Sequence, residues 1–293
     1  MALNVQTLKT RSLTATVFVL IMLLGLFWNH WSFFVLFSII HFGCWMEYQK
    51  MIGLIDKDYR QISSFHKYGV MIAGWCIMLY FTNDAFMIGS IHLHSLGWWL
   101  GLILVFILPI IELLFAREVK PQNIGYSAIG LLYISLSWGL MIDLRCAGLN
   151  MQGEKIVSDT GYLIPAGLIF SIWINDTMAY IVGSLIGKTP FSSISPKKTW
   201  EGTLGGAILC ILIVSLTGWW MKSLHVIHWV MISLIAAVVG TAGDLLESKL
   251  KRMANLKDSG SIMPGHGGFL DRFDSLILAS PFVWLYVRLF VTD

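Results

Sequence analysis

Long apolar runs separated by short polar segments dominate the pattern along this chain. Several runs are shorter than the roughly 20 residues that cross a ~30 Å hydrocarbon core, so their helices are expected to extend into the flanking residues. The pattern predicts an all-α polytopic membrane protein with about nine transmembrane helices. The runs lie at residues 13–28, 31–46, 68–82, 96–116, 124–142, 163–186, 203–220, 226–242 and 276–291.

The composition supports a membrane location. Hydrophobic residues make up 56% of the 293 residues and charged residues 13%, whereas soluble domains average about 25% charged residues. No long polar segment offers room for a soluble domain. We therefore predict a single integral membrane domain over residues 1–293, with its catalytic part at 163–275 and no nucleic-acid partner.

The distribution of basic residues predicts the orientation of the chain. With a cytoplasmic N-terminus, all but four of the 20 Lys and Arg residues fall in cytoplasmic segments; the exceptions are Arg145, Lys155, Lys222 and Arg288. Short cytoplasmic loops are enriched in Lys and Arg, so we predict a cytoplasmic N-terminus and a C-terminus on the opposite side. The segments after the sixth and eighth runs then share the cytoplasmic face, where nucleotides and Mg²⁺ are available.

Two polar features lie in and just after the sixth run. Asp176 is near the middle of this run, where a carboxylate is costly unless it is paired or faces water. A helix–helix hydrogen bond would explain it, but a polar cavity is the favoured interpretation.

Ser195 and Pro196 stand in the order of an N-cap and first turn, so a helix is expected to begin there. Its first turn would present Lys197 and Lys198 to a phosphate, or to anionic lipid head groups; Lys188 and Thr199 fit either interpretation.

The segment 244–274 interleaves acidic and basic side chains around a glycine-rich turn. Asp244, Glu247 and Ser248 recur at helical spacing, so Asp244 shares a face with the other two. Four glycines between positions 260 and 268 permit the positive φ angles of a tight anion-binding loop. The charges would neutralise one another in surface salt bridges, or hold a divalent cation and phosphates. The glycine turn favours the second explanation, which is typical of phosphoryl or nucleotidyl transfer.

Histidines receive lesser roles. His266, within the turn, is assigned to phosphate binding or loop structure, because a phosphate nucleophile is already ionised and needs no general base. The pairs His92/His94 and His225/His228 have spacings that suggest a metal site. Both pairs lie on the face predicted to be opposite the acidic cluster, and we interpret them as interfacial histidines.

The segment 248–274 resembles the signature of the phosphatidate cytidylyltransferase (CDP-diacylglycerol synthase) family. That signature contains Ser, a Lys-Arg pair, Lys-Asp, a Pro-x-His-Gly-Gly turn and Asp-Arg-x-Asp. One departure is Met263, where the family more often has Leu, Ile or Phe. The resemblance is clear over residues 176–274. The matching positions are Ser248, Lys251, Arg252, Lys257, Asp258, Pro264, His266, Gly267, Gly268, Asp271, Arg272 and Asp274.

The resemblance implies transfer of the cytidylyl group from CTP to phosphatidic acid, giving CDP-diacylglycerol and pyrophosphate, with Mg²⁺ required and the identity of any second cation open. It implies a multi-pass protein of the cell (inner) membrane with its site facing the cytoplasm, and suggests a homodimer. Carried over by position, the metal ligands are Asp244 and Asp271, supported by Asp274 and Asp258. The CTP phosphates would be bound by Lys251, Arg252, Lys257 and Arg272. A phosphate of either substrate would be bound by Ser195, Lys197 and Lys198. Other substrate-binding candidates are Asp176, Lys188, Thr199, Ser248, Gly267 and Gly268.

Two rival hypotheses stay open. A relative of this family could cytidylylate another lipid phosphate, such as an ether lipid or a polyprenyl phosphate. An ion-coupled transporter could use Asp176 and Asp244 as relay groups. The transporter predicts inverted repeats and broken helices, and the sequence shows no internal repeat.

Overall fold

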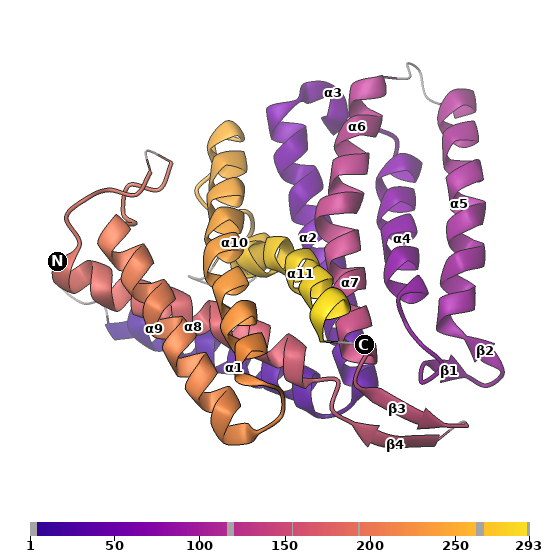
Figure 1. Cartoon of the computed structure of the whole chain (residues 1–293). Coiled ribbons are helices and arrows are strands. Elements are labelled where there is room, and N and C mark those ends of the chain that lie inside the picture. Colours follow the sequence, from indigo (N-terminus) through magenta and orange to yellow (C-terminus); the bar gives the residue numbers. More distant parts are fainter. Residues whose placement is uncertain (1–4, 116–119, 154, 193, 262–266, 292–293) are drawn as a thin grey trace. The chain divides into compact units, whose positions relative to one another are not determined.

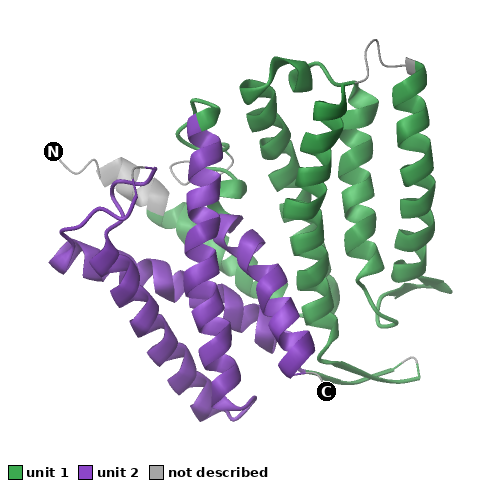
Figure 2. Cartoon of the chain, turned by 45° about the horizontal axis from the view of Figure 1, so that its top comes forward, with its two compact units in different colours: residues 1–159, 253–272 green, residues 160–252, 273–293 purple. Residues whose placement is uncertain are grey.

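The computed structural model describes residues 5–115, 120–153, 155–192, 194–261 and 267–291. The chain divides into two compact units, shown in green and purple in Figure 2. Unit 1 comprises residues 1–159 and 253–272, and unit 2 comprises residues 160–252 and 273–293. The C-terminal glycine-rich segment of the sequence therefore packs with the N-terminal helices of unit 1.

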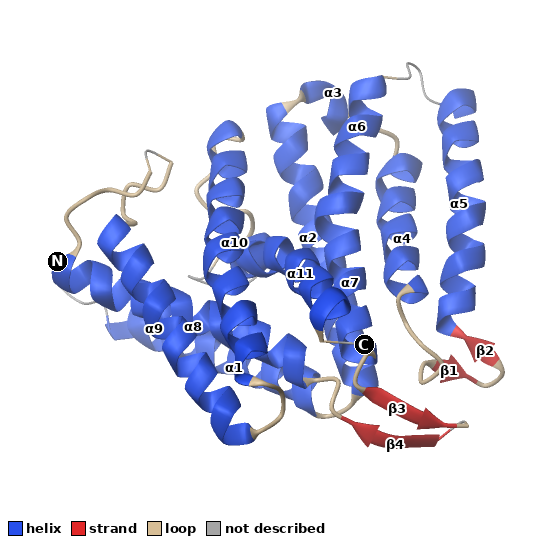
Figure 3. Ribbon diagram, viewed as in Figure 1, coloured by secondary structure: helices blue, strands red, loops and turns tan. Residues whose placement is uncertain are grey.

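Unit 1 consists of helices and two short hairpins (Figures 1 and 3). Its core is aromatic: Phe37 of the second helix lies 5.1 Å from the Trp138 ring, centroid to centroid. The indole nitrogen of Trp45 donates a hydrogen bond to Ser135, which lies in a π-helical segment. The elements are α1 (Val5–Phe27), α2 (His30–Ile55), α3 (Lys57–Arg60), α4 (Ser64–Tyr80), β1 (Met87–Ile88), β2 (Ile91–His92), α5 (Leu93–Phe115), α6 (Pro121–Gly130), η1 (Leu131–Leu136), α7 (Ser137–Cys146), β3 (Leu149–Gln152) and β4 (Lys155–Asp159).

The two hairpins were absent from the all-helical prediction, which treated the polar segments between apolar runs as plain loops. β1 pairs with β2, and β3 pairs with β4, each antiparallel. Gly89 and Gly153 supply the positive φ angles, 64° and 62°, at the two turns, a conformation that glycine adopts without steric cost. The buried Arg145 ties α7 to β4 through two hydrogen bonds to the Asp159 carboxylate, of 2.6 and 2.5 Å.

Unit 2 contains four long helices. They are α8 (Leu163–Ile186), α9 (Trp200–Met221), α10 (Val226–Met253) and α11 (Leu270–Phe290), the last two extending to or from unit 1 at one end. α10 continues eleven residues beyond the apolar run that ended at Ala242. Glu247 and Lys251 form an i,i+4 ion pair along this extension, which supports the helical conformation of the polar end.

Helices α8 and α9 approach closely through small residues. A Cβ atom at Gly206 would lie 2.7–2.8 Å from the backbone and Cβ atoms of Ala179. Such small-residue contacts let helix backbones pack tightly in membranes, where apolar burial alone does not drive association. This contact fixes α9, and with it the segment that leads into α9, against α8, which carries half of the residues lining the pocket described below.

Gly206→Ala is expected to lower the thermal midpoint in detergent, because overpacking at a backbone contact costs about 1–3 kcal/mol. The matched control is Gly125→Ala, on the exposed face of α6, where a Cβ atom meets nothing within 4 Å. That change is expected to be neutral or to stabilise by about 0.5–1 kcal/mol, since alanine favours helix over glycine. Equal midpoints for the two variants would contradict the close α8–α9 contact.

The long apolar helices identify the chain as an all-α membrane protein. Each apolar run of the sequence overlaps a helix among the described residues: α1, α2, α4, α5, the continuous α6–η1–α7 segment, and α8 to α11. Among the described residues, six helices are long and apolar enough to cross a bilayer, and the apolar part of α1, Ser12–Phe27, is shorter. The six are Leu93–Leu114, Pro121–Cys146, Leu163–Ile186, Trp200–Met221, Val226–Met253 and Leu270–Phe290.

Candidate active site

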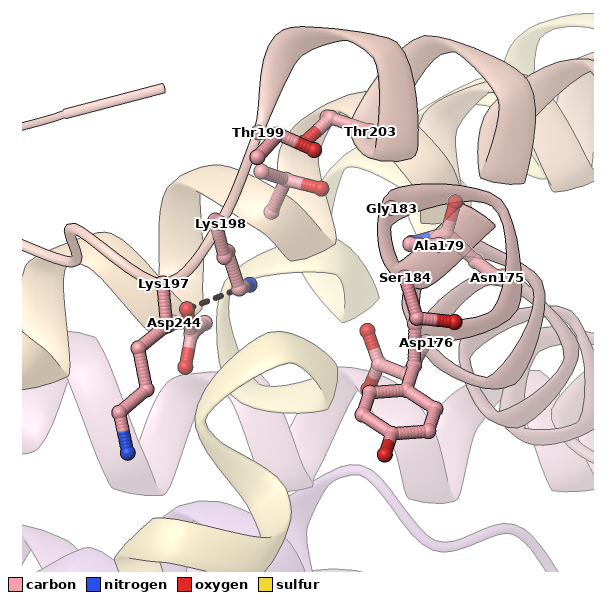
Figure 4. A pocket seen from close by; sticks show the side chains of 12 residues that line it. Asn175, Asp176, Ala179, Gly183, Ser184, Lys197, Lys198, Thr199, Thr203 and Asp244 are labelled. Atoms are coloured by element: carbon pink, nitrogen blue, oxygen red, sulfur yellow. Dashed lines mark ion pairs between the residues drawn. The ribbon is translucent and has the colours of Figure 1, made fainter. Parts of the chain in front are cut away.

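A pocket of about 480 Å³ opens in unit 2 between α8, α10 and the segment that leads into α9 (Figure 4). Its wall combines carboxylates, amines and hydroxyls with the small residues that let α8 and α9 approach. Asp176 lies in this wall, on a part of α8 that is exposed within the unit. The lining residues are Asn175, Asp176, Ala179, Tyr180, Gly183, Ser184, Lys197, Lys198, Thr199, Thr203, Thr241 and Asp244.

An ion pair crosses the pocket. Lys198 Nζ lies 2.6 Å from Asp244 Oδ2, and the two side chains are 31% and 26% exposed. Figure 4 shows the Lys198 side chain directed at Asp244 from the segment before α9. The pair places a cation and a carboxylate, both partly open to solvent, at one point of the pocket wall. Such a pair can separate to receive a phosphate on the amine and a metal ion on the carboxylate.

Four carboxylates gather in unit 2 around this pair. Asp274 of α11 is 7% exposed and feels the negative charges of Asp244, Glu247 and Asp176. Glu247 is fully buried and pairs with Lys251 one helical turn later, at 2.5 Å. Like charges held together in a low-dielectric region repel strongly. A divalent cation would offset that repulsion, and carboxylate oxygens such as those of Asp244 and Asp274 are the type of ligand that Mg²⁺ prefers.

The conformation of the segment before α9 shows that one prediction was wrong. A helix does not begin at Ser195: residues 195–198 form a turn, with the Lys198 N–H donating to Ser195 O at 3.1 Å. α9 begins at Trp200, and Thr199 is its N-cap, accepting from Gly202 N. The reason is that 189–191 pairs with 198–200, through Phe191 N to Lys198 O and Trp200 N to Thr189 O. This short ladder holds the backbone extended up to the cap.

Glu201, which the sequence analysis missed, clamps the same segment. Its carboxylate accepts hydrogen bonds from the Lys188 and Thr189 N–H groups, at 3.1–3.2 Å, and from the Thr189 hydroxyl, at 2.8 Å. An acidic residue two positions after a Thr N-cap is the sequence signal that could have revealed it. The clamp closes residues 188–201 into a loop and so positions Lys198 at the pocket.

In unit 1, the described part of the glycine-rich segment folds around Asp271. The Asp271 Oδ2 atom accepts from the N–H groups of Ser259 and Gly268, both at 2.8 Å, and lies 2.9 Å from the Ser259 hydroxyl oxygen. Gly267 has φ 83°, which supports the prediction of a left-handed turn at that glycine. One oxygen of the predicted metal ligand therefore organises the loop.

Glu47 is the second carboxylate of this loop, and the sequence analysis missed it because it stands one residue beyond the second apolar run. It is 6% exposed. Its carboxylate accepts from the Ser259 hydroxyl at 2.7 Å and from the N–H groups of Phe269 and Leu270, both at 2.9 Å. Three donors around one buried carboxylate make a strong, charge-assisted attachment. α2 thereby anchors the residues that lead directly into Asp271 and Arg272.

Two of the loop glycines have a different role from the one predicted. A Cβ atom at Gly260 or at Gly268 would overlap the Glu47 carboxylate. Neither has a positive φ angle. These glycines are needed for the close approach of Glu47, whereas Gly267 has the left-handed conformation among the described glycines of the loop.

The other predicted site residues occupy varied positions. Ser248 is half-buried on α10, and Asp258 lies on the exposed surface of unit 1. The basic residues Lys188, Lys197, Arg252, Lys257 and Arg272 are exposed. His266 and Pro264 lie outside the described residues.

Comparison with known proteins gives concordant results. The chain matches the model of the cytidylyltransferase family over residues 9–290. A phosphatidate cytidylyltransferase of Bacillus subtilis is 33% identical over 193 residues, which cover 65% of this chain and 68% of that protein. A phosphatidate cytidylyltransferase of Staphylococcus saprophyticus is 32% identical over 217 residues, which cover 73% of this chain and 76% of that protein. One of Synechocystis is 42% identical over 131 residues, which cover 44% of this chain and 45% of that protein.

Proposed function

Because this chain belongs to the cytidylyltransferase family, we propose that it transfers the cytidylyl group of CTP to phosphatidic acid, forming CDP-diacylglycerol and pyrophosphate for phospholipid synthesis. The observation that carries the proposal is the pocket of unit 2, where Lys198 meets Asp244 beside the carboxylates of Asp176 and Asp274. A pocket built on apolar helices suits an acceptor that is itself a lipid. Its amines and carboxylates suit a nucleotide held with a divalent cation.

The proposed reaction is a direct displacement. A phosphatidate oxygen, already ionised at neutral pH, attacks the α-phosphorus of CTP, and the bond from that phosphorus to the bridging oxygen breaks. The electron pair leaves with pyrophosphate, so neither a general base nor a covalent enzyme intermediate is needed. Catalysis then rests on positioning and charge neutralisation. Lys198 would orient a phosphate at the pocket, with Ser195, Lys197 and Thr199 beside it.

Basic side chains are proposed for the nucleotide end of the site. Lys251, Arg252, Lys257 and Arg272 would bind the triphosphate, Ser248, Gly267 and Gly268 would line its path, and Lys188 would add charge from the loop before α9. Asp244, Asp271 and Asp274, with Asp258 in support, would hold Mg²⁺, which supplies charge neutralisation on the phosphates when bound. His266 would serve phosphate binding or loop structure.

The proposed topology has nine membrane-spanning helices, a cytoplasmic N-terminus and a C-terminus on the other side of the cell (inner) membrane. The excess of Lys and Arg in one set of short segments supports it. The site would face the cytoplasm, where CTP is present. A homodimer is proposed from the family likeness alone.

The decisive experiment supplies the purified protein with radiolabelled CTP, Mg²⁺ and one lipid phosphate at a time. Phosphatidic acid is expected to yield labelled CDP-diacylglycerol and an equal amount of pyrophosphate, and EDTA is expected to stop both. Parallel reactions contain an archaeal-type ether lipid or a polyprenyl phosphate. Labelled product from one of these alone would replace phosphatidic acid as the substrate, and no nucleotidyl transfer to any of them would refute the proposal.

A further inference from the structure

The β1–β2 hairpin of unit 1 brings together three side chains with metal-binding chemistry. His92 Nδ1 lies 3.1 Å from Asp84 Oδ1, and His94 Nδ1 lies 3.9 Å from the same oxygen. The two imidazole centroids are 5.4 Å apart. The sequence analysis interpreted His92 and His94 as interfacial histidines and did not consider Asp84. In the structure, the Asp84 carboxylate is the third group of the cluster.

The hairpin has a well-defined backbone around these residues. Met87 pairs with His92 and Ile88 with Ile91, leaving Gly89 and Ser90 as the two turn residues. Gly89 has φ 64°, as a tight hairpin turn requires at its first central position. The Leu93 N–H donates to Phe86 O at 3.0 Å and extends the ladder beyond the strands.

Two buried residues fix the hairpin to the core of unit 1. Phe86 is fully buried, with its ring centroid 4.9 Å from that of His30 and 5.3 Å from that of Trp31. Leu93 is 5% exposed. The residue between the two histidines is thus packed into unit 1, whereas His92 and His94 are each 36% exposed.

We infer that Asp84, His92 and His94 form a binding site for a divalent transition-metal ion of the Zn²⁺ type. The three ligand atoms lie within 4.8 Å of one another. Around tetrahedral Zn²⁺, with bonds of about 2.0–2.2 Å, ligand atoms stand roughly 3.3–3.5 Å apart. The distances of 3.1 and 3.9 Å bracket that value, so only small side-chain movements are needed to complete the coordination.

The state of the two ring nitrogens supports the assignment. Nδ1 of His92 and Nδ1 of His94 are both shielded from solvent, and neither forms a well-aligned hydrogen bond with any described group. Shielded polar atoms ordinarily have a partner. A metal ion between the rings and Asp84 would satisfy both nitrogens at once, and the 71% exposure of Asp84 leaves the remaining coordination positions open to water.

The ligand set also selects the class of ion. Two imidazole nitrogens and one carboxylate suit Zn²⁺ and its neighbours in the first transition row, whereas Mg²⁺ and Ca²⁺ prefer oxygen ligands alone. This separates the hairpin site from the proposed catalytic carboxylates, which are all oxygen donors. Bound metal would clamp the loop before β1 to the start of α5.

The test uses the full-length protein, purified through a tag without histidine and stripped of metal. Zn²⁺ is titrated against a chromophoric chelator in millimolar Mg²⁺, which occupies oxygen-only sites. The wild type is expected to bind one Zn²⁺ per chain tightly, and His92→Ala, His94→Ala and Asp84→Asn are expected to weaken binding by roughly 100-fold or more, because each removes one of three ligands. The control His225→Ala alters an exposed histidine outside the cluster and is expected to bind as the wild type does.

A second measurement identifies the ligands directly. Co²⁺ in the site is expected to show the intense visible absorption of a tetrahedral complex with nitrogen and oxygen ligands, and this band is expected to vanish in His92→Ala and in the milder His92→Gln. Variants are compared only when they elute as one monodisperse peak. Equal Zn²⁺ affinity in the wild type and all three cluster variants would overturn the inference, as would a wild type that leaves the chelator fully loaded.

Discussion

Asp244→Asn is expected to lower the rate of CDP-diacylglycerol formation by about 10³-fold while leaving the fold intact. The asparagine keeps the size of the side chain but removes the charge that faces Lys198 and would bind the cation. Because Asp244 also adds to the negative charge around the buried Asp274, its neutralisation relieves repulsion. The thermal midpoint is therefore expected to stay the same or rise. Product formation and the midpoint are measured on the same purified sample.

The matched control for this variant is Asp58→Asn. Asp58 forms a 2.8 Å ion pair with Lys120, and the Lys120 and Asp58 side chains are 38% and 51% exposed, so loss of the pair is expected to change activity and stability little. Lys198→Met and Lys120→Met remove the lysine partners of Asp244 and Asp58, and their activity and thermal midpoints are compared in the same way. An Asp244→Asn protein that forms product at the wild-type rate would remove Asp244 from the site. A large loss of stability would instead make its role structural.

Glu47→Ala is expected to destabilise the protein by about 3 kcal/mol or more and to abolish activity. The change leaves the Phe269 and Leu270 N–H groups without their acceptor and the Ser259 hydroxyl with Asp271 Oδ2 alone. Each buried group left unpaired costs about 1–3 kcal/mol. The segment they belong to leads into Asp271 and Arg272. The midpoint of thermal unfolding, the rate of product formation and amide hydrogen exchange at residues 259–261 and 267–270 report the three effects.

A conservative variant separates anchoring from simple loss of volume. Glu47→Gln keeps one acceptor oxygen, but its amide N–H₂ must face at least one of the three donors, so an intermediate loss of stability is expected. Met46→Ala is the control on the same helix, because Met46 stands next to Glu47 in the sequence but is 50% exposed. Wild-type hydrogen exchange in the loop of Glu47→Ala would show that Glu47 does not anchor it.

The helices were predictable because their signal is local. Apolar runs long enough to approach bilayer thickness leave few alternatives to helix, since every backbone polar group in lipid must be satisfied within the element. The helical face of Asp244 and Glu247 followed from spacing alone and agrees with α10. The start of α9 was misplaced, because the choice between Ser195 and Thr199 as cap depends on pairing with residues 189–191, which capping preferences do not include.

The sequence by itself determined the helical membrane architecture, the acidic and basic residues of the site and, through its motif, the family. The tertiary structure decided which of these residues meet. Glu47 is bonded to Ser259 across 212 positions of the chain, and Asp84 is joined to His92 and His94 by the course of a hairpin. A buried carboxylate accepts hydrogen bonds from the donors that the fold brings within about 3 Å of it. The spacing of residues along the sequence does not reveal which donors those are.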